Sequence, residues 1–164
     1  AEDVVSIDAV IAPTSDPFEL NGEGAVRYAA EQWVWSDGVP VSGSTPKRVA
    51  RRFAELEVDD FIDGAKAGEP QYGLSSPHVR VTLKDATDGI RVVSLGAKGP
   101  THTDSEGNAV ARYYASIGGE DSVYLVHHGL YEVVRDLVRE SGRKAARDAE
   151  KAARQERIGS ETPE

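Results

Sequence analysis

The feature that most constrains the fold is the run HVRVTLKDATDGIRVVSLG at residues 78–96. Val79, Val81 and Leu83 alternate with polar residues, which is the period of a half-buried strand. Asp88-Gly89 is a two-residue turn signal, and the apolar run IRVVSL follows it. The run therefore predicts an antiparallel β-hairpin, and the rest of the chain must supply a sheet and a cover for its apolar face.

Further strand patterns lie on both sides of this hairpin. Residues 4–12 alternate apolar and polar side chains, and a weaker pattern covers residues 17–30. The segment QWVWSDGVPV predicts a short strand with Trp33 and Trp35 on one face. After a polar connection, ARYYASI and SVYLVHH predict a second pair of neighbouring strands.

Two segments have helical periodicity. In residues 44–56, Thr45 is the expected N-cap with Pro46 at the first helical position. A second helix follows the last strand, and we expect Ser141-Gly142 to end or bend it. Its apolar stripe consists of Leu130, Val133, Val134 and Leu137. The order of elements predicts an α+β fold, a mainly antiparallel sheet with two helices packed on one face.

We expect a single α+β domain over residues 1–142 and a charged helical tail over residues 143–164 that is partly disordered at its end. Residues 143–157 carry six basic and three acidic side chains, whereas the whole chain has a net charge of −9. An acidic body thus ends in a basic helix, and the net negative charge argues against a nucleic-acid partner. Because the sequence has no cysteine, it excludes disulfides and thiolate metal sites.

An ordered set of short motifs runs through residues 30–138. They are Trp33, a helix over Val49–Leu56, Tyr72-Gly73-Leu74 with Pro77, Leu95-Gly96, Tyr113-Tyr114, and Val123-Tyr124-Leu125-Val126. In this order the motifs resemble the bacterial family called domain of unknown function 4340. The resemblance implies an extracytoplasmic (periplasmic) cell-envelope protein without an established catalytic activity, often encoded near ABC-transporter or gliding-type components.

Members of that family commonly have an amino-terminal membrane helix and often carry repeats, whereas this sequence shows one unit and a long charged tail. No apolar run approaches the ~20 residues that span a bilayer. The start at Ala1 without methionine is expected of a processed chain whose membrane anchor has been removed. The resemblance therefore implies a membrane-associated protein partner, with membrane contact only through such an anchor, and it leaves the oligomeric state open.

Candidate partner-binding residues are aromatic or basic. Because successive strand residues face opposite ways, Tyr113 and Tyr114 cannot both be buried. One of them, with one tryptophan, is a candidate for an exposed patch on the uncovered sheet face. A solvated helix face is the simpler interpretation of the basic cluster in residues 44–56. The candidates are Trp35, Tyr113, Tyr114, Arg48, Arg51, Arg52, Arg147 and Arg154.

The histidines give weaker signals. Pro77 favours an extended backbone before it, so we expect His78 at a strand start on the sheet rim rather than as the base of a neighbouring serine. The segment THTDSEGN supplies weak metal-ligand candidates, but its spacing does not match a calcium loop and favours a polar hairpin. These candidates are His102, Asp104 and Glu106. His127-His128 face opposite ways on a strand, which favours a capping or rim role over a shared metal.

The sequence contains no nucleophile elbow, phosphate loop or dinucleotide fingerprint. We therefore expect no enzyme activity, no cofactor and no bound metal. The favoured function is a non-catalytic envelope domain that mediates protein–protein interaction in a membrane-associated assembly of transporter or motility type. The alternatives are a small-ligand or carbohydrate-binding module that uses an aromatic sheet face, and a metal-dependent hydrolase centred on His102 and Asp104.

Overall fold

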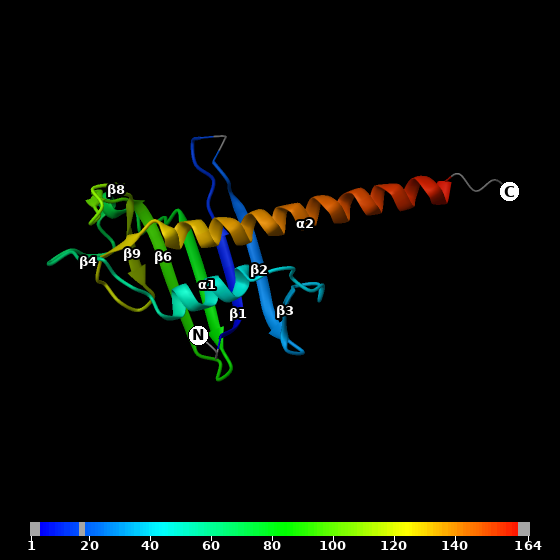
Figure 1. The fold of residues 1–164 in the computed structure, drawn as a ribbon, viewed down its shortest axis with the longest axis horizontal. Helices are drawn as coiled ribbons and strands as arrows, with labels where there is room; N and C mark the ends of the chain where they lie inside the picture. Colours follow the sequence, from blue (N-terminus) through cyan, green and yellow to red (C-terminus); the bar gives the residue numbers. More distant parts are fainter. Residues whose placement is uncertain (1–3, 17–18, 161–164) are drawn as a thin grey trace.

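A computed structural model of the chain describes residues 4–16 and 19–160. Eight strands form one antiparallel sheet in the order β3-β2-β1-β5-β6-β9-β10-β4, and both helices cross the same face of it (Figure 1). This arrangement confirms the predicted α+β class. The helices are α1 (Thr45–Ala54) and α2 (Gly129–Ser160), and a 3-10 turn covers Pro70–Tyr72. The strands are β1 (Val4–Ile11), β2 (Gly22–Ala29), β3 (Gln32–Trp35), β4 (Asp60–Phe61), β5 (Val79–Asp85), β6 (Ile90–Lys98), β7 (His102–Thr103), β8 (Ala109–Val110), β9 (Arg112–Ile117) and β10 (Tyr124–His127).

The predicted hairpin, β5 and β6, lies at the centre of the sheet. Val81 pairs with Ala9 of β1 on one side and with Val93 of β6 on the other, and all three side chains are buried. These side chains face the helices, whereas Arg80 and Lys84 alternate to the opposite face and are exposed. The period of two that is visible in the sequence thus sets which face carries the core.

The N-cap of helix α1 lies one residue earlier than predicted. Ser44 occupies the N-cap position, without a side-chain cap hydrogen bond, and Pro46 lies in the first turn. Thr45 is instead buried, and its hydroxyl donates to the carboxylate of Glu140 on α2 at 2.6 Å. The predicted cap was wrong by one position, because the Thr45 hydroxyl binds Glu140 of α2 instead of a backbone N–H group of its own helix.

Helix α2 continues through the predicted break. It runs without interruption from Gly129 to Ser160, so Ser141-Gly142 neither ends nor bends it. A helical glycine costs only about 1 kcal/mol relative to alanine, and strong helix formers lie on both sides of this one. Nothing lies within 4 Å of the position that a Cβ of Gly142 would take. The helix therefore carries the chain past the edge of the sheet (Figure 1).

The Tyr72-Gly73-Leu74 motif packs on the second half of the hairpin. Gly73 has a φ of +66°, and a Cβ at Gly96 would lie 2.1 Å from the carbonyl oxygen of Tyr72. Tyr72 also meets Tyr114 edge-on, with ring centroids 4.9 Å apart. Two of the predicted motifs are therefore in direct contact, and the contact requires glycine at position 96. The two-residue strand β4, which sequence patterns missed, follows α1 and extends the sheet beyond β10.

Candidate functional site: a basic helical surface

Charge is divided between the helices and the rest of the chain. The two helices contain 12 of the 19 Lys and Arg residues but only 6 of the 28 Asp and Glu residues. The remainder holds 7 basic and 22 acidic residues. Exposed basic side chains on both helices form what we call the basic helical surface: Lys47, Arg48, Arg51, Arg52, Arg143, Arg147, Lys151 and Arg154.

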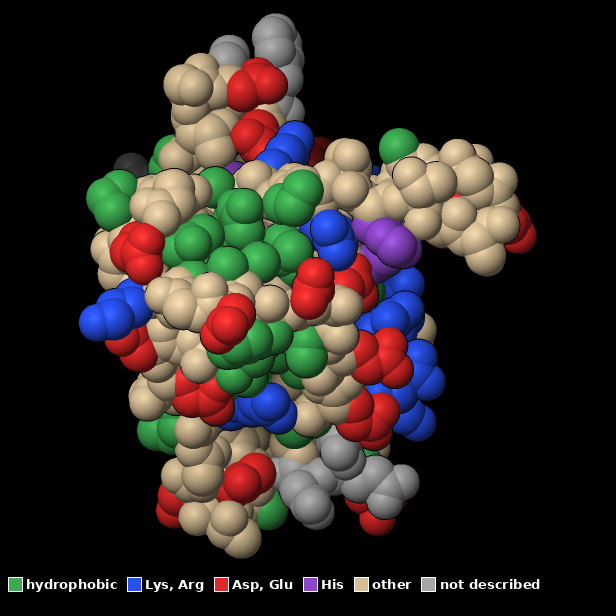
Figure 2. All heavy atoms as spheres, turned by 90° about the vertical axis from the view of Figure 1, so that its left-hand side faces the viewer, with side chains coloured by type: hydrophobic (Ala, Val, Ile, Leu, Met, Phe, Trp, Pro, Cys, Tyr) green, Lys and Arg blue, Asp and Glu red, His purple; other side chains and the backbone are tan. Residues whose placement is uncertain are grey.

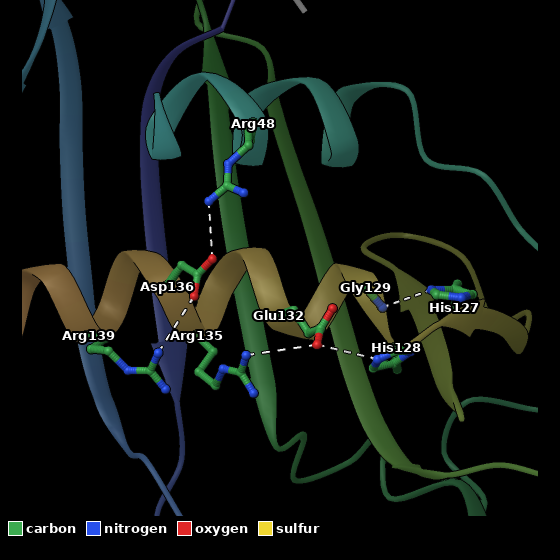
Figure 3. A network of polar contacts seen from close by, with 8 residues as sticks. All are labelled: Arg48, His127, His128, Gly129, Glu132, Arg135, Asp136 and Arg139. Atoms are coloured by element: carbon green, nitrogen blue, oxygen red, sulfur yellow. Dashed lines mark hydrogen bonds and ion pairs between the residues drawn. The ribbon is translucent and has the colours of Figure 1, made fainter. Parts of the chain in front are cut away.

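Packing of α1 determines which side chains point outward. Val49 and Phe53 are fully buried against the sheet, so the basic residues between them lie on the solvent side. Arg48 pairs with Asp136 of α2 at 3.1 Å, which ties the two helices together (Figure 3). Asp136 also lies 3.9 Å from Arg139. Arg48 is thus partly neutralised by its own chain.

Arg51 and Arg52 differ from Arg48 because neither forms an ion pair with any described residue. Both line a cavity of about 260 Å³ at the end of α1, together with Glu55, Glu57, Asp59, His127 and Leu130. A second cavity of about 320 Å³ shares Asp59 and His127 with it and is also lined by His102, Asp104, Val110 and Arg112. Sequence reasoning missed this charged depression, and its only signals are the acidic run after α1 and the paired histidines.

The histidine pair organises the start of α2. Nδ1 of His127 accepts the backbone N–H of Gly129 at 3.0 Å, so this nitrogen satisfies one of the free N–H groups at the start of α2 (Figure 3). Nε2 of His128 lies 3.4 Å from Glu132, which is 3.9 Å from Arg135. The ring nitrogens thus have separate partners, but the ring centroids lie only 4.8 Å apart. The expectation that the two side chains face opposite ways was wrong because β10 ends at His127, so strand alternation does not extend to His128.

Lys144 marks the point where α2 leaves the sheet. Its ammonium group donates to Asp148 at 2.6 Å and to Asp37, which follows β3. The hydrogen bond to Asp148, followed by that to Asp37, raises the pKa of Lys144, and the hydrogen bond from Lys144 lowers the pKa of Asp37. These contacts connect the helix to the sheet edge. From Ala145 to Gly159 every residue of α2 is exposed.

This exposed part of α2, residues 145–159, has a basic side. Arg143, Arg147, Lys151 and Arg154 recur at intervals of four, four and three residues, so they lie along one face of the helix. None of them forms an ion pair with another described residue. The opposite face carries Ala145, Ala149 and Ala152. The candidates Arg147 and Arg154 therefore belong to one charged face rather than to scattered positions.

The aromatic candidates are mostly in the core. Trp35 pairs with Val26 in the face that the helices cover, and it is only 7% exposed. Tyr113 packs against Tyr131 of α2, with ring centroids 5.6 Å apart, and burial raises its pKa. Tyr114 alternates to the opposite face but is covered in part by Tyr72. The register therefore places no tryptophan on the uncovered face, and an aromatic patch of the expected kind is not formed there.

The metal candidates form a turn. The carboxylate of Asp104 accepts the N–H groups of Glu106 and Asn108, which closes the hairpin between β7 and β8 and lowers the pKa of Asp104. His102 and Glu106 are exposed on this hairpin. Within residues 4–16 and 19–160, no group of three or more His, Cys, Asp or Glu side chains is placed to hold a metal ion.

His78 lies between the sheet and α2. Its side chain is 15% exposed, with Nε2 3.4 Å from Glu19 and the ring 5.6 Å from that of Tyr131. The backbone carbonyl of His78 accepts from Ala12, which extends the β1–β5 pairing by one residue. The residue thus precedes its strand as expected, but its ring packs against the helix layer.

The fold and this surface define an α+β domain whose basic helices cover one face of an antiparallel sheet, with the acidic residues concentrated in the connecting segments. The chain belongs to the family described as Domain of unknown function (DUF4340), whose model matches residues 33–136. This match confirms the family resemblance, and it ends before the exposed part of α2. Comparisons with curated proteins and with solved structures find no match. Neither described helix is long and apolar enough to cross a bilayer.

Proposed function

We propose that this chain is a non-catalytic domain of the bacterial cell envelope that binds a protein partner in a membrane-associated assembly of transporter or motility type. In this proposal the domain lies on the extracytoplasmic side of the membrane. The basic helical surface supplies the contact. The observation that carries the proposal is the set of exposed arginines on α1 and α2 that lack an acidic partner among the described residues.

The charge of the surface indicates the chemistry of the partner. Arg51, Arg52, Arg147 and Arg154 present guanidinium groups, which bind carboxylates through paired hydrogen bonds. A partner with exposed Asp and Glu side chains matches this surface. Such a contact is steered by charge, so its association rate falls as salt is added.

The non-catalytic part of the proposal is supported by how the titratable groups are used. His127 caps α2, His128 meets Glu132, and Asp104 closes a turn. Each of these groups has a structural partner, and no described serine is paired with a histidine as nucleophile and base. The charged depression beside Arg51 mixes both signs, which suits a protein edge better than a single ion.

The test is affinity capture from detergent-solubilised envelope of the source organism, followed by mass spectrometry. We expect the full chain to enrich membrane-associated components and the variant R51E/R52E to lose them, and the variant R147E/R154E shows whether the α2 portion of the surface also contributes to this capture. R80E/K84E is the matched control, because it reverses two exposed charges on the opposite sheet face. Equal capture by all variants would contradict the surface, and capture of no membrane-associated component by the full chain would contradict the function.

A further inference from the structure

The basic face of α2 and an acidic surface around β4 lie at opposite ends of the molecule (Figure 1), and Arg51 and Arg52 of α1 line a cavity together with Glu57 and Asp59 of that acidic surface. The exposed part of α2 extends beyond one edge of the sheet, and strand β4 forms the opposite edge (Figure 1). Around β4 lie exposed acidic residues with two large exposed apolar side chains, Val58 at 46% and Phe61 at 51%. We call this surface the acidic end: Glu57, Val58, Asp59, Asp60, Phe61 and Asp63. None of its four carboxylates forms an ion pair with a described residue.

Figure 2 looks at the end of the sheet that carries β4 and shows hydrophobic side chains gathered there, with acidic side chains and some basic ones around them. Phe61 packs against Tyr124 of β10, with ring centroids 5.9 Å apart, so its ring is held in place at the sheet margin. The acidic end is therefore a fixed apolar surface whose border carries more negative than positive charge, with Arg51, Arg52 and Arg112 lining the cavities beside Glu57 and Asp59. Its complement is a helix face with basic residues and an apolar side chain.

The exposed part of α2 has that composition. Ile158 lies four residues after Arg154, on the same face as the basic residues, and it is 61% exposed. Each surface thus combines charge of one sign with large exposed apolar groups. One acid, Glu150, lies at the margin of the basic face, so the face keeps a clear excess of positive charge.

The two surfaces cannot meet within one molecule. Helix α2 is continuous from Gly129 to Ser160, and its exposed part points away from β4 (Figure 1). A continuous helix of this length does not fold back on its own sheet. A contact between α2 and the acidic end therefore joins two molecules.

We propose that the acidic end of one copy of this chain binds the exposed part of α2 of a second copy. The inference rests on the proposed function, because it names the partner of one part of the basic helical surface. The α2 portion binds a second copy, and the α1 portion is left to a different protein. Each copy offers one helix and one acidic end, so the contact is head-to-tail and generates rings or open chains of copies.

The experiment is sedimentation velocity on the purified full chain over a concentration series at two ionic strengths. Charge attraction reaches about 30 Å at about 0.01 M salt and only about 3 Å at about 1 M. We expect species larger than a monomer at low salt, and an apparent association constant at least about tenfold lower at high salt. A chain that stays monomeric at every concentration at low salt would overturn the inference.

Charge-swapped variants identify the two surfaces. R147E/R154E removes the net positive charge of the helix face and D59K/D60K removes the net negative charge of the acidic end, so each variant alone is expected to be monomeric at low salt. An equimolar mixture is expected to form pairs again, because the unmodified helix of D59K/D60K meets the unmodified acidic end of R147E/R154E. A mixture that stays monomeric would contradict this pairing, and circular dichroism of each variant checks that it is folded.

R80E/K84E is the control here too, and we expect it to associate like the unmodified chain. Association that is lost equally in this control would overturn the assignment to these two surfaces. The outcome also separates the inference from the proposed function. A monomeric chain that still captures an envelope protein through Arg147 and Arg154 rejects the second copy as the occupant and keeps the proposed function.

Discussion

The two halves of α2 differ in what stabilises them. In the first half, Gly129–Lys144, Val134 and Leu137 are fully buried against the sheet. In the second half every side chain from Ala145 to Gly159 is exposed. Short isolated helices are marginal in water because nucleation is costly. The packed half supplies the nucleus, and alanine and arginine, which have high helix propensity, extend it.

This difference has a consequence for function. At 1.5 Å per residue, the exposed half reaches roughly 22 Å beyond Lys144. It therefore carries its basic face to a distance at which another molecule can contact it without displacing the core. The first half positions the helix, and the second half presents charge. Substitutions in the two halves should accordingly change different properties of the protein.

The largest expected effect is in the packed half. Leu137 is fully buried and lies over Gly24 of β2. Leu137→Ala removes the contacts of this side chain and leaves a cavity under α2. We therefore expect the free energy of unfolding to fall by about 2–5 kcal/mol. The measurement is the urea midpoint and slope followed by circular dichroism.

Ala149→Gly is the matched change in the exposed half. It lowers helix propensity by at most about 1 kcal/mol, and it acts locally because no other element packs on that residue. We expect an unchanged urea midpoint with a small loss of helical signal. If both variants shifted the urea midpoint equally, the two halves of α2 would unfold as one cooperative unit, which would contradict the conclusion that only the first half is stabilised by packing.

Two glycine-to-alanine substitutions, one under the packed half of α2 and one in an open part of the helix, should change stability in opposite directions. At Gly24 a Cβ would lie 3.2 Å from Cγ of Leu137 and 3.3 Å from its carbonyl oxygen. Gly24→Ala should therefore push α2 from the sheet and cost about 1–3 kcal/mol. Gly142 has open space around it, so Gly142→Ala should stabilise the chain by about 0.5–1 kcal/mol.

Thermal unfolding of the two single variants and of the double variant measures these effects. The double variant should show the sum of the two single effects, because the two glycines share no neighbour. A stabilising effect of Gly24→Ala would mean that the helix has room to move outward. A destabilising effect of Gly142→Ala would mean that the helix needs the glycine as a hinge.

The centre of the fold was predictable because its signals are local. Alternation in residues 79–95 and the Asp88-Gly89 turn determine the hairpin, and the stripe from Leu130 to Leu137 determines the packed half of α2. Strand β4 was missed because two residues show no period. The end of α2 was misplaced because Gly142, read locally as a stop, is tolerated within a strongly helical segment.

The candidate surface was predictable only in part. The basic residues of α1 and α2 were found, because charge is visible in sequence and apolar periodicity indicates the outward face. Alternation correctly separates Tyr113 from Tyr114, but it does not say which of the two faces the helices, so the burial of Tyr113 could not be predicted. Only the position of α2 over β9 and β1 decides that. The link between Lys144 and Asp37 joins distant segments and leaves no local pattern.

A smaller effect is expected at the boundary between the two halves. Lys144→Met keeps the apolar stem but removes the hydrogen bonds to Asp37 and Asp148. We expect little change in global unfolding, because exposed ion pairs contribute little. The amides of residues 145–149 should become more mobile, which nitrogen-15 relaxation measures. Unchanged relaxation would show that packing alone holds the base of the exposed half.

The pH dependence of this contact has a defined sign. The pKa of Asp37 is lowered from 3.8 in the folded chain, so its stabilising contribution is present above that value and is lost as pH falls through the lowered pKa. The pKa of Lys144 is raised from 10.5, so its contribution is present below that value and is lost as pH rises through the raised pKa. Mobility of residues 145–149 should therefore be constant near neutral pH and increase at both extremes. In Asp37→Asn, the rise in mobility of residues 145–149 that comes from protonation of Asp37 at acid pH should be absent.

The smallest expected effect on stability comes from the largest change in sequence. Removing residues 145–164 deletes the whole exposed half, yet none of residues 145–159, whose side chains the structure describes, belongs to the hydrophobic core. We expect the free energy of unfolding, measured from the urea transition, to change by no more than about 0.5 kcal/mol. The same truncation should abolish concentration-dependent association at low salt and any partner capture that depends on Arg147 and Arg154. A large loss of stability would show that the exposed half supports the fold, and it would then be unsuited to act as a separate binding element.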